Sequence, residues 1–257
     1  MNTAKLKESA EKIIPRKYLR VAGMYFLRAQ YNRLKGDAVE CPCCEKHFKR
    51  FLSYGVKART GALCPWCLAL ERHRLLWKYL ENKTNIYIDE VKVLHFAPEH
   101  QFQERLKSAD NVDYLSCDID MPTAMDKQDI TELTYEDNRF DVILCNHVLE
   151  HIRDDAKAMS ELFRVLKPSG WAILQTPMSN RANTIEDLEE TDPKELERLF
   201  GQNDHVRTYG LDKKDRLEAA GFEVVVDDYV QTAFTEEEQK YYGFDVSEMI
   251  YLVRKPQ

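Results

Sequence analysis

The sequence contains little glycine and proline, with nine of each among 257 residues. This scarcity excludes collagen-like and low-complexity chains. No apolar run approaches the ~18 residues of a membrane-spanning helix, which excludes an integral membrane protein. The N-terminus lacks the apolar core and cleavage site of a secretory signal. We therefore expect a cytoplasmic protein whose seven cysteines are thiols or metal ligands rather than disulfides.

The net charge of −7 is unevenly distributed along the chain. Residues 1–35 sum to +7 and residues 41–80 to +6, whereas residues 81–257 carry −18. A basic front and an acidic body indicate one of two arrangements. Either the front meets an anionic partner, such as a nucleic acid or a membrane surface, or two solvated faces partly compensate each other.

Three parts are expected along the chain. Residues 1–36 form a basic amphipathic helical segment, to whose apolar stripe Tyr25 and Phe26 contribute. We favour packing of this segment on the rest of the protein, and the alternative is an interfacial helix on the inner face of the membrane. Residues 37–83 form a cysteine module followed by a helix, and residues 84–257 form the main domain.

Short apolar runs alternate with helical stretches after residue 90. The expected strands are residues 91–95, 112–117, 140–145, 171–176, 223–227 and 249–254. The expected helices are residues 98–108, 154–167, 193–200 and 212–220. This alternation predicts an α/β fold with a mostly parallel sheet that is covered on both faces. No long helix is expected between the last two strands, which can therefore form an antiparallel edge.

Two C-x-x-C pairs, Cys41/Cys44 and Cys64/Cys67, are separated by 19 residues. Two such pairs supply the tetrahedral set of four thiolates that Zn²⁺ prefers, and a set with no open position predicts a structural metal. Cys43 lies inside the first pair and is an alternative ligand. An iron–sulfur cluster and a redox dithiol are the competing interpretations. Basic residues around the pairs, among them Lys49, form a nucleic-acid surface or compensate the negative charge of the metal site.

The most specific pattern lies in residues 140–176. Phe140–Asp154 begins as a buried strand, and Glu161–Trp171 contains RVLKPSG, a helix end and turn that lead into the apolar strand WAILQTP. This pattern resembles the fourth strand, the following helix and the fifth strand of class I S-adenosylmethionine-dependent methyltransferases of the type 11 kind. The resemblance covers about residues 85–257. It implies a Rossmann-like seven-stranded sheet that binds S-adenosylmethionine (SAM) at the carboxyl ends of its strands.

The same resemblance assigns cofactor contacts beyond the second strand. Asp118 ends that strand and is expected to accept the ribose hydroxyls, with Ile119 beside the adenosine. Asp129 and Ile130 match the family's pair near the adenine. For a single carboxylate, the alternative is a turn residue or a helix cap.

The first strand is followed by no glycine, although the family normally has a glycine-rich loop there. The segment His95-Phe96-Ala97-Pro98-Glu99 stands in its place and resembles a methyltransferase subgroup that carries a cysteine ribbon. We assign cofactor contacts to His95, Phe96, Ala97 and Glu99. Glu99 either reaches the cofactor's ammonium group or favours the dipole of the next helix.

Asn146 and His147 match positions that line the methyl-donor end of the cofactor site. His205 lies in the polar segment 200–210, and together with His147 it is a candidate base, because imidazole titrates near neutral pH. The favoured function is SAM-dependent methyl transfer to a small-molecule or glycan-type acceptor. The alternatives are a zinc-ribbon RNA methyltransferase and a catalytically inactive binding protein on a methyltransferase fold.

Overall fold

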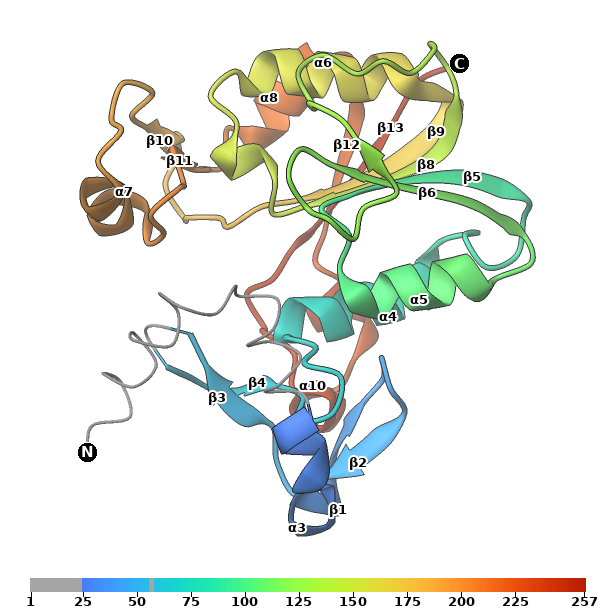
Figure 1. Cartoon of the computed structure of the whole chain (residues 1–257), viewed down its shortest axis with the longest axis vertical. Helices are drawn as coiled ribbons and strands as arrows, with labels where there is room; N and C mark the ends of the chain where they lie inside the picture. The colour runs from blue at the N-terminus through green and yellow to red at the C-terminus, as the bar shows by residue number, and fades with distance from the viewer. Residues whose placement is uncertain (1–24, 56–57) are drawn as a thin grey trace. The chain divides into compact units, whose positions relative to one another are not determined.

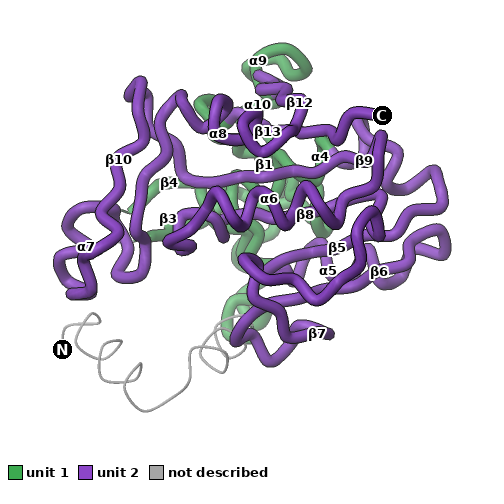
Figure 2. The backbone as a smooth tube through the Cα atoms, turned by 90° about the horizontal axis from the view of Figure 1, so that it is seen from above, with its two compact units in different colours: residues 1–79, 230–248 green, residues 80–229, 249–257 purple. Residues whose placement is uncertain are grey.

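The computed structural model describes residues 25–55 and 58–257. Most of the expected N-terminal helical segment therefore lies outside the described residues. The chain divides into two compact units, residues 1–79 with 230–248, and residues 80–229 with 249–257 (Figure 2). Residues 230–248 thus group with the cysteine module, although in the sequence they lie within the expected main domain.

The first unit is built from two small hairpins and short helices (Figure 1). Its elements are α3 (Tyr31–Leu34), β1 (Lys35–Cys41), β2 (Lys46–Phe48), β3 (Leu52–Tyr54), β4 (Arg59–Leu63), the start of α4 (Glu71–Lys83), α9 (Tyr229–Ala233) and α10 (Glu236–Tyr242). β1 pairs with β2 and β3 with β4, both antiparallel. Buried Phe48 and Phe51 form a small core with three residues that include Cys41 and Cys64.

The guanidinium of Arg74 ties the first unit together. Arg74 is fully buried and donates hydrogen bonds to the carbonyls of Ala62, Ala69 and Tyr242, at 2.8, 3.1 and 2.7 Å. Its guanidinium also lies 3.9 Å from the centre of the Phe51 ring. One side chain therefore joins the cysteine module to the segment that contains α10, because a buried guanidinium must satisfy several donors at once.

The second unit contains a seven-stranded sheet, which confirms the expected fold class. Its elements are β5 (Val91–Phe96), α5 (His100–Ser108), β6 (Val112–Asp118), β7 (Asp126–Lys127), β8 (Phe140–Asn146), the 3₁₀ helix η1 (Leu149–His151), α6 (Asp155–Val165), β9 (Leu166–Gln175), β10 (Ile185–Glu186), α7 (Pro193–Phe200), β11 (Arg207–Thr208), α8 (Lys213–Ala219), β12 (Glu223–Asp227) and β13 (Ile250–Arg254). The strand order is β12-β13-β9-β8-β5-β6-β7. Helices α6 and α8 lie on one face of the sheet and α5 on the other (Figure 1).

The direction of the last strands differs in one respect from the expectation. β12 and β13 pair antiparallel, as expected, but β13 also pairs antiparallel with β9. The edge strand β12 therefore runs in the same direction as the rest of the sheet, and only β13 is reversed. Among the described residues, no helix combines the length and apolarity that a membrane span needs.

The turn expected at Lys167–Gly170 lies inside a strand rather than between a helix and a strand. α6 ends at Val165, and β9 begins directly at Leu166 rather than at Trp171. The extra residues pair irregularly with β8, and Ser169 adopts a positive φ of 64°. The change of direction is thus built into the strand, and Gly170 permits the close approach of the Asp141 carbonyl, which would lie 2.9 Å from an added Cβ.

Candidate active site

Three neighbouring strands of the sheet end at the same level. β5 pairs with β6 and with β8, so that Phe96 lies opposite both Cys117 and Cys145. The residues that follow, Ala97, Asp118 and Asn146, therefore line one edge of the sheet. This is the carboxyl edge, where open parallel α/β sheets bind their ligands.

The loop after β5 adopts a glycine-like backbone without glycine. Ala97 has a φ of 44°, and its amide donates to the Cys117 carbonyl at 3.0 Å. Pro98 and Glu99 then lead into α5, for which Glu99 is the N-cap. A non-glycine residue in this region is strained, so Ala97 stands in a backbone conformation that glycine adopts more readily.

The side chain of His95 is buried beneath this loop rather than exposed at the edge. Its Nδ1 lies 3.0 Å from the Tyr114 hydroxyl, and its Nε2 lies 2.6 Å from the Glu99 carboxylate. Phe96 is also buried, within the core of the sheet. The imidazole therefore fixes the orientation of Glu99 and leaves the backbone of the loop to face the edge.

The two carboxylates assigned to the adenosine are each held by their own loop. Asp118 Oδ1 accepts hydrogen bonds from the amides of Asp120 and Met121, both at 2.7 Å. Asp129 Oδ1 accepts hydrogen bonds from the amide and the hydroxyl of Thr131, both at 2.8 Å. The hydrogen bond from the Thr131 amide is the main cause of the lowered pKa of Asp129. In each case the hydrogen bonds to one carboxylate oxygen hold a turn, and the same bonds fix the direction of the second oxygen. Beside them, Ile119 is half exposed and Ile130 is buried.

Asn146 ends β8 and His147 follows it, at the centre of the edge. Asn146 is 4% exposed, yet neither its amide nitrogen nor its oxygen has a hydrogen-bond partner within the described chain. His147 adopts a φ of 55°, and its amide donates to the Gln175 carbonyl at 2.8 Å. Buried polar atoms are nearly always paired, so unsatisfied atoms at this position indicate a bound group.

A buried carboxylate, Glu150, brings the two candidate bases together. His147 Nδ1 lies 3.3 Å from Glu150 Oε1, and a Glu150 oxygen lies within 4.8 Å of ligand atoms of His151 and His205. The rings of His151 and His205 meet edge to face at 4.6 Å. Burial acts to raise the pKa of Glu150, but the contact with His147 more than offsets this, and the pKa lies below its ordinary value.

Arg207 holds the turn that carries this cluster. Its fully buried guanidinium donates to the carbonyls of Leu149 and Arg153, both at 2.9 Å, and to that of Ile152. It also pairs with Glu186 at 3.0 Å. Arg207 therefore serves as an internal anchor, and its charge is matched by Glu186 and by Asp155, whose Oδ2 lies 3.6 Å from Nε.

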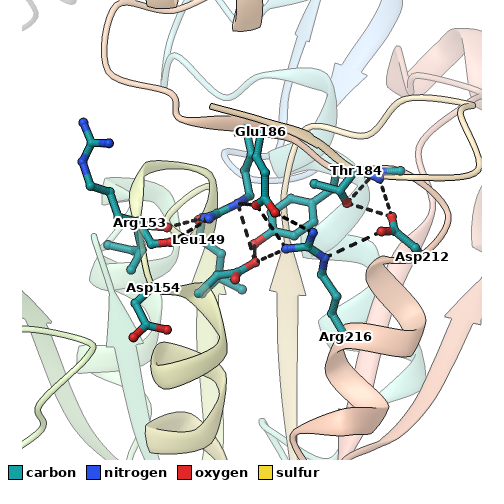
Figure 3. Close-up of polar contacts among 12 residues, drawn as sticks. Leu149, Arg153, Asp154, Thr184, Glu186, Asp212 and Arg216 are labelled. Carbon is teal, nitrogen blue, oxygen red and sulfur yellow. Dashed lines mark hydrogen bonds and ion pairs between the residues drawn. The ribbon is translucent and has the colours of Figure 1, made fainter. Parts of the chain in front are cut away.

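A second arginine completes the polar network around Arg207. Arg216 contacts Glu186 at 2.9 Å, Asp155 at 3.1 Å and Asp212 at 3.7 Å (Figure 3). Asp155 in turn accepts the Tyr209 hydroxyl at 2.7 Å. The network fixes η1 and α6 to the segment that carries His205.

In the first unit, four cysteine sulfurs converge. Those of Cys41, Cys44, Cys64 and Cys67 lie within 4.8 Å of one another. The sulfurs of Cys41 and Cys67 are 3.6 Å apart, and those of Cys44 and Cys64 are 3.8 Å apart. Cys43 is not part of this group, and its sulfur faces the His73 carbonyl at 3.6 Å.

Comparison with known proteins identifies the family. The family model described as "Methyltransferase domain" matches residues 56–226. This chain belongs to that methyltransferase family. It is accordingly a SAM-dependent methyltransferase of class I, as the resemblance of residues 140–176 predicted.

Several solved structures are similar to this methyltransferase. An S-adenosylmethionine-dependent methyltransferase from Mesorhizobium loti is 12% identical, with 70% of this chain and 98% of that chain covered and a TM-score of 0.49. The [4+2]-cyclase SpnF is 14% identical, with 73% and 82% covered and a TM-score of 0.48. Phosphoethanolamine N-methyltransferase 2 from Haemonchus contortus is 15% identical, with 66% and 49% covered and a TM-score of 0.46. A search of curated proteins finds no match.

The sequence analysis of the methyltransferase missed Glu150, His151 and the anchoring role of Arg207. The run Val148–Ile152 has the composition of a helix start, so Glu150 and His151 carried no separate signal there. Only the fold brings β11 against η1, where the amide of Val206 donates to the Glu150 carbonyl at 2.9 Å. The three-residue spacing from His147 to Glu150, one turn of a helix, is the signal that could have indicated their contact.

Proposed function

We propose that this methyltransferase transfers the methyl group of SAM to a hydroxyl of a small-molecule or glycan-type acceptor at the carboxyl edge of the sheet. The observation that carries the proposal is the set Asn146, His147 and Glu150 beside the loop of Ala97: Asn146 and Glu150 are buried, His147 is partly buried, and the set has unsatisfied polar atoms. SAM supplies an activated methyl group when bound, so the protein mainly has to position the acceptor and accept its proton.

The cofactor is held by residues that the edge already orients. Asp118 presents its second carboxylate oxygen to the ribose hydroxyls, while Asp129 and Ile130 flank the adenine and Ile119 covers the adenosine. The backbone at His95–Ala97 approaches the methionine part, and Glu99, fixed by His95, binds the ammonium group. Asn146 supplies an amide oxygen and nitrogen at the donor end, which would satisfy its own buried polar atoms.

His147 is the proton acceptor in this proposal. With Nδ1 directed at Glu150, a proton on Nδ1 is stabilised and the Nε2 lone pair remains available, as in other carboxylate–histidine pairs. The new bond forms between the acceptor oxygen and the methyl carbon, and the carbon–sulfur bond breaks with its electron pair left on sulfur. The hydroxyl proton moves to His147 Nε2. His205, the second candidate base, has a ring nitrogen within 4.8 Å of a Glu150 oxygen.

The basic residues of the cysteine module support a small acceptor over RNA. Arg74 is buried and binds carbonyls, Arg59 pairs with Glu71 at 3.1 Å, and Lys49 donates to the Arg33 carbonyl at 3.1 Å. Lys46 lies 4.5 Å from the centre of the Trp66 ring. The buried Arg74 is therefore withdrawn from any phosphate-binding surface and the charge of Arg59 is partly matched by Glu71, whereas Lys49 stays exposed.

Calorimetric titration with SAM tests the cofactor site. Asp118→Asn keeps an oxygen acceptor for the turn but removes the charge, so we expect SAM affinity to fall at least about tenfold, since a charged hydrogen bond is worth about 1.5–3 kcal/mol. Asp113→Asn, near the start of the same strand, is the matched control and should bind as the parent does. Equal SAM affinity of the Asp118 variant and the parent would contradict the assignment.

We also propose that Cys41, Cys44, Cys64 and Cys67 hold a structural zinc ion. A tetrahedral site with zinc–sulfur bonds of about 2.3 Å has sulfur–sulfur edges of about 3.8 Å, close to the distances found here. Metal analysis tests this. Cys44→Ser should lose the zinc and unfold the module, whereas Cys43→Ser, the matched control, should keep one equivalent. Zinc retained by the Cys44 variant and lost by the Cys43 variant would reverse the ligand assignment.

A further inference from the structure

The cluster around Glu150 contains more unsatisfied polar atoms than a proton transfer requires. Glu150 is 1% exposed and His205 is 3% exposed. In residues 25–55 and 58–257, Glu150 Oε2 and both ring nitrogens of His205 have no hydrogen-bond partner, and Glu150 Oε1 has only the ion-pair contact with His147 Nδ1 at 3.3 Å. A buried polar group without a partner costs about 1–3 kcal/mol, and a charged one costs more, so several in one place call for a common ligand.

The donor set indicates the chemistry of that ligand. Two imidazoles and one carboxylate have ligand atoms within 4.8 Å of one another. Neutral imidazole nitrogens and a carboxylate form the two-histidine, one-carboxylate set that suits divalent transition metals. Among the groups that face the cluster, His147 and Asp204 contact it from outside the set, at Glu150 and at His151.

The surroundings of His151 match those of a metal ligand. Its Nδ1 lies 3.3 Å from the Asp204 carbonyl oxygen, to which it can donate. Metal-bound histidines usually donate their other ring N–H to a carbonyl or carboxylate, which fixes the tautomer and leaves one lone pair for the metal. Glu150 is supported similarly by His147.

The cluster is also held rigidly. Arg207 donates to carbonyls on both sides of Glu150 and His151 in the sequence. His205 lies two residues before Arg207 on the same segment. The Val206 amide donates to the Glu150 carbonyl at 2.9 Å. The two segments that carry the ligands are thus joined by a backbone hydrogen bond. Metal bonds of about 2.1 Å require ligand atoms about 3.0–3.5 Å apart, and side-chain rotations alone bring the three ligand atoms to that spacing.

We propose that Glu150, His151 and His205 bind one divalent transition-metal ion, distinct from the metal of the cysteine cluster. Its role rests on the proposed function: a cation at this point of the edge coordinates the acceptor hydroxyl, lowers its pKa and orients it toward the methyl group, while His147 takes the released proton. Metal binding itself is independent of the acceptor and of SAM.

Cobalt(II) is the probe, because its absorption reports its ligands. Zinc-loaded protein is titrated with Co²⁺, with bound metal measured by equilibrium dialysis. Binding at nitrogen and oxygen ligands gives weak visible bands alone, whereas thiolate binding adds an intense near-ultraviolet charge-transfer band. We expect the parent protein to bind one equivalent of Co²⁺ with weak visible bands alone. Glu150→Gln and His205→Asn should weaken it at least about tenfold, since even partners outside the ligand set cost 10–100-fold.

The controls separate this proposal from the others. Glu195→Gln and His100→Asn replace an exposed glutamate and an exposed histidine and should bind Co²⁺ as the parent does. Asp118→Asn should lose SAM affinity yet keep the cobalt, so failure of the cofactor site is distinguishable from failure of the metal site. Thermal unfolding shows whether each variant folds, and Co²⁺ should raise the melting temperature of the parent but not of the Glu150 variant. The proposal would be overturned if all bound Co²⁺ showed the thiolate charge-transfer band, or if the parent and the Glu150 variant bound Co²⁺ with equal affinity.

Discussion

Replacement of Arg207 is the strongest test of how this active site is held together. Arg207→Met keeps the packing of the aliphatic stem but removes every donor. The carbonyls of Leu149, Ile152 and Arg153 then lose a partner, at about 1–3 kcal/mol for each buried group left unsatisfied. Glu186 keeps Arg216 at 2.9 Å, so its carboxylate does not become an isolated charge.

The costs of the three unsatisfied carbonyls are not additive, because the turn at residues 149–153 can partly relax and expose them to water. We expect the free energy of unfolding to fall by about 3–5 kcal/mol, the usual cost of breaking a buried ionic network. This is a large part of the 5–15 kcal/mol that stabilises a typical domain. Arg207→Lys, which keeps the charge but has a single donor group, should lie between the parent and the methionine variant.

Urea unfolding measures the global effect, and amide hydrogen exchange measures the local one. The Val206 amide, which donates to the Glu150 carbonyl, should exchange faster in the methionine variant. Arg198→Met is the matched control, because Arg198 forms an exposed pair with Glu195 and should change stability by no more than about 1 kcal/mol. If Arg207→Met stays within about 1 kcal/mol of the parent, Arg207 is not the anchor described here.

Three further predictions concern the loops at the edge and the dependence on pH. Ala97→Gly should raise the unfolding free energy by about 0.5–1 kcal/mol in urea titrations, because φ is positive there, and Ala97→Val should lower it; equal stability of the two variants would contradict the backbone assigned to this loop. His95→Leu should destabilise the protein by about 1–3 kcal/mol, since Glu99 and the Tyr114 hydroxyl each lose a partner, whereas the exposed substitution His100→Leu should not. The hydrogen bonds from Arg164 lower the pKa of Glu161, so the stabilisation they provide is present above the ordinary pKa of about 4.5 and is lost as the pH falls through the lowered value. Urea unfolding of Glu161→Gln between pH 6 and pH 3 should therefore show a shallower loss of stability than the parent, and an identical slope would rule out this contribution.

The order of elements in the second unit could be predicted from the sequence because most strands contain a short apolar or β-branched run, and these runs alternate with helical stretches. The expected strands at 223–227 and 140–145 agree with β12 and β8 to within one residue, and the expected helix at 193–200 is α7. Asp192 caps α7 and Pro193 begins it, which are local signals. β7, with two residues, has no periodicity to detect.

The parts of the site that depend on tertiary contacts could not be predicted. Glu150 is charged and lies in a helix-like run, so the sequence favours an exposed position, and only the packing of β11 against η1 buries it. The contacts of His95 also carry no local signal: the sequence assigns it a cofactor contact, and the fold buries its side chain against Tyr114 and Glu99. Arg207 carries no local signal either, because its partners lie more than fifty residues away in the chain, at Leu149 and Ile152.

The grouping of residues 230–248 with the cysteine module has a consequence for protein engineering. The chain crosses between the units three times, so a cut after residue 83 would not release two self-sufficient halves. The larger fragment would carry α10 away from Arg74, whose donors hold the Tyr242 carbonyl, and from His47, which meets Tyr241 at 3.1 Å. The module is thus not an interchangeable cassette at the front of the enzyme: a homologue's ribbon could be grafted only together with the loop that links the final two strands.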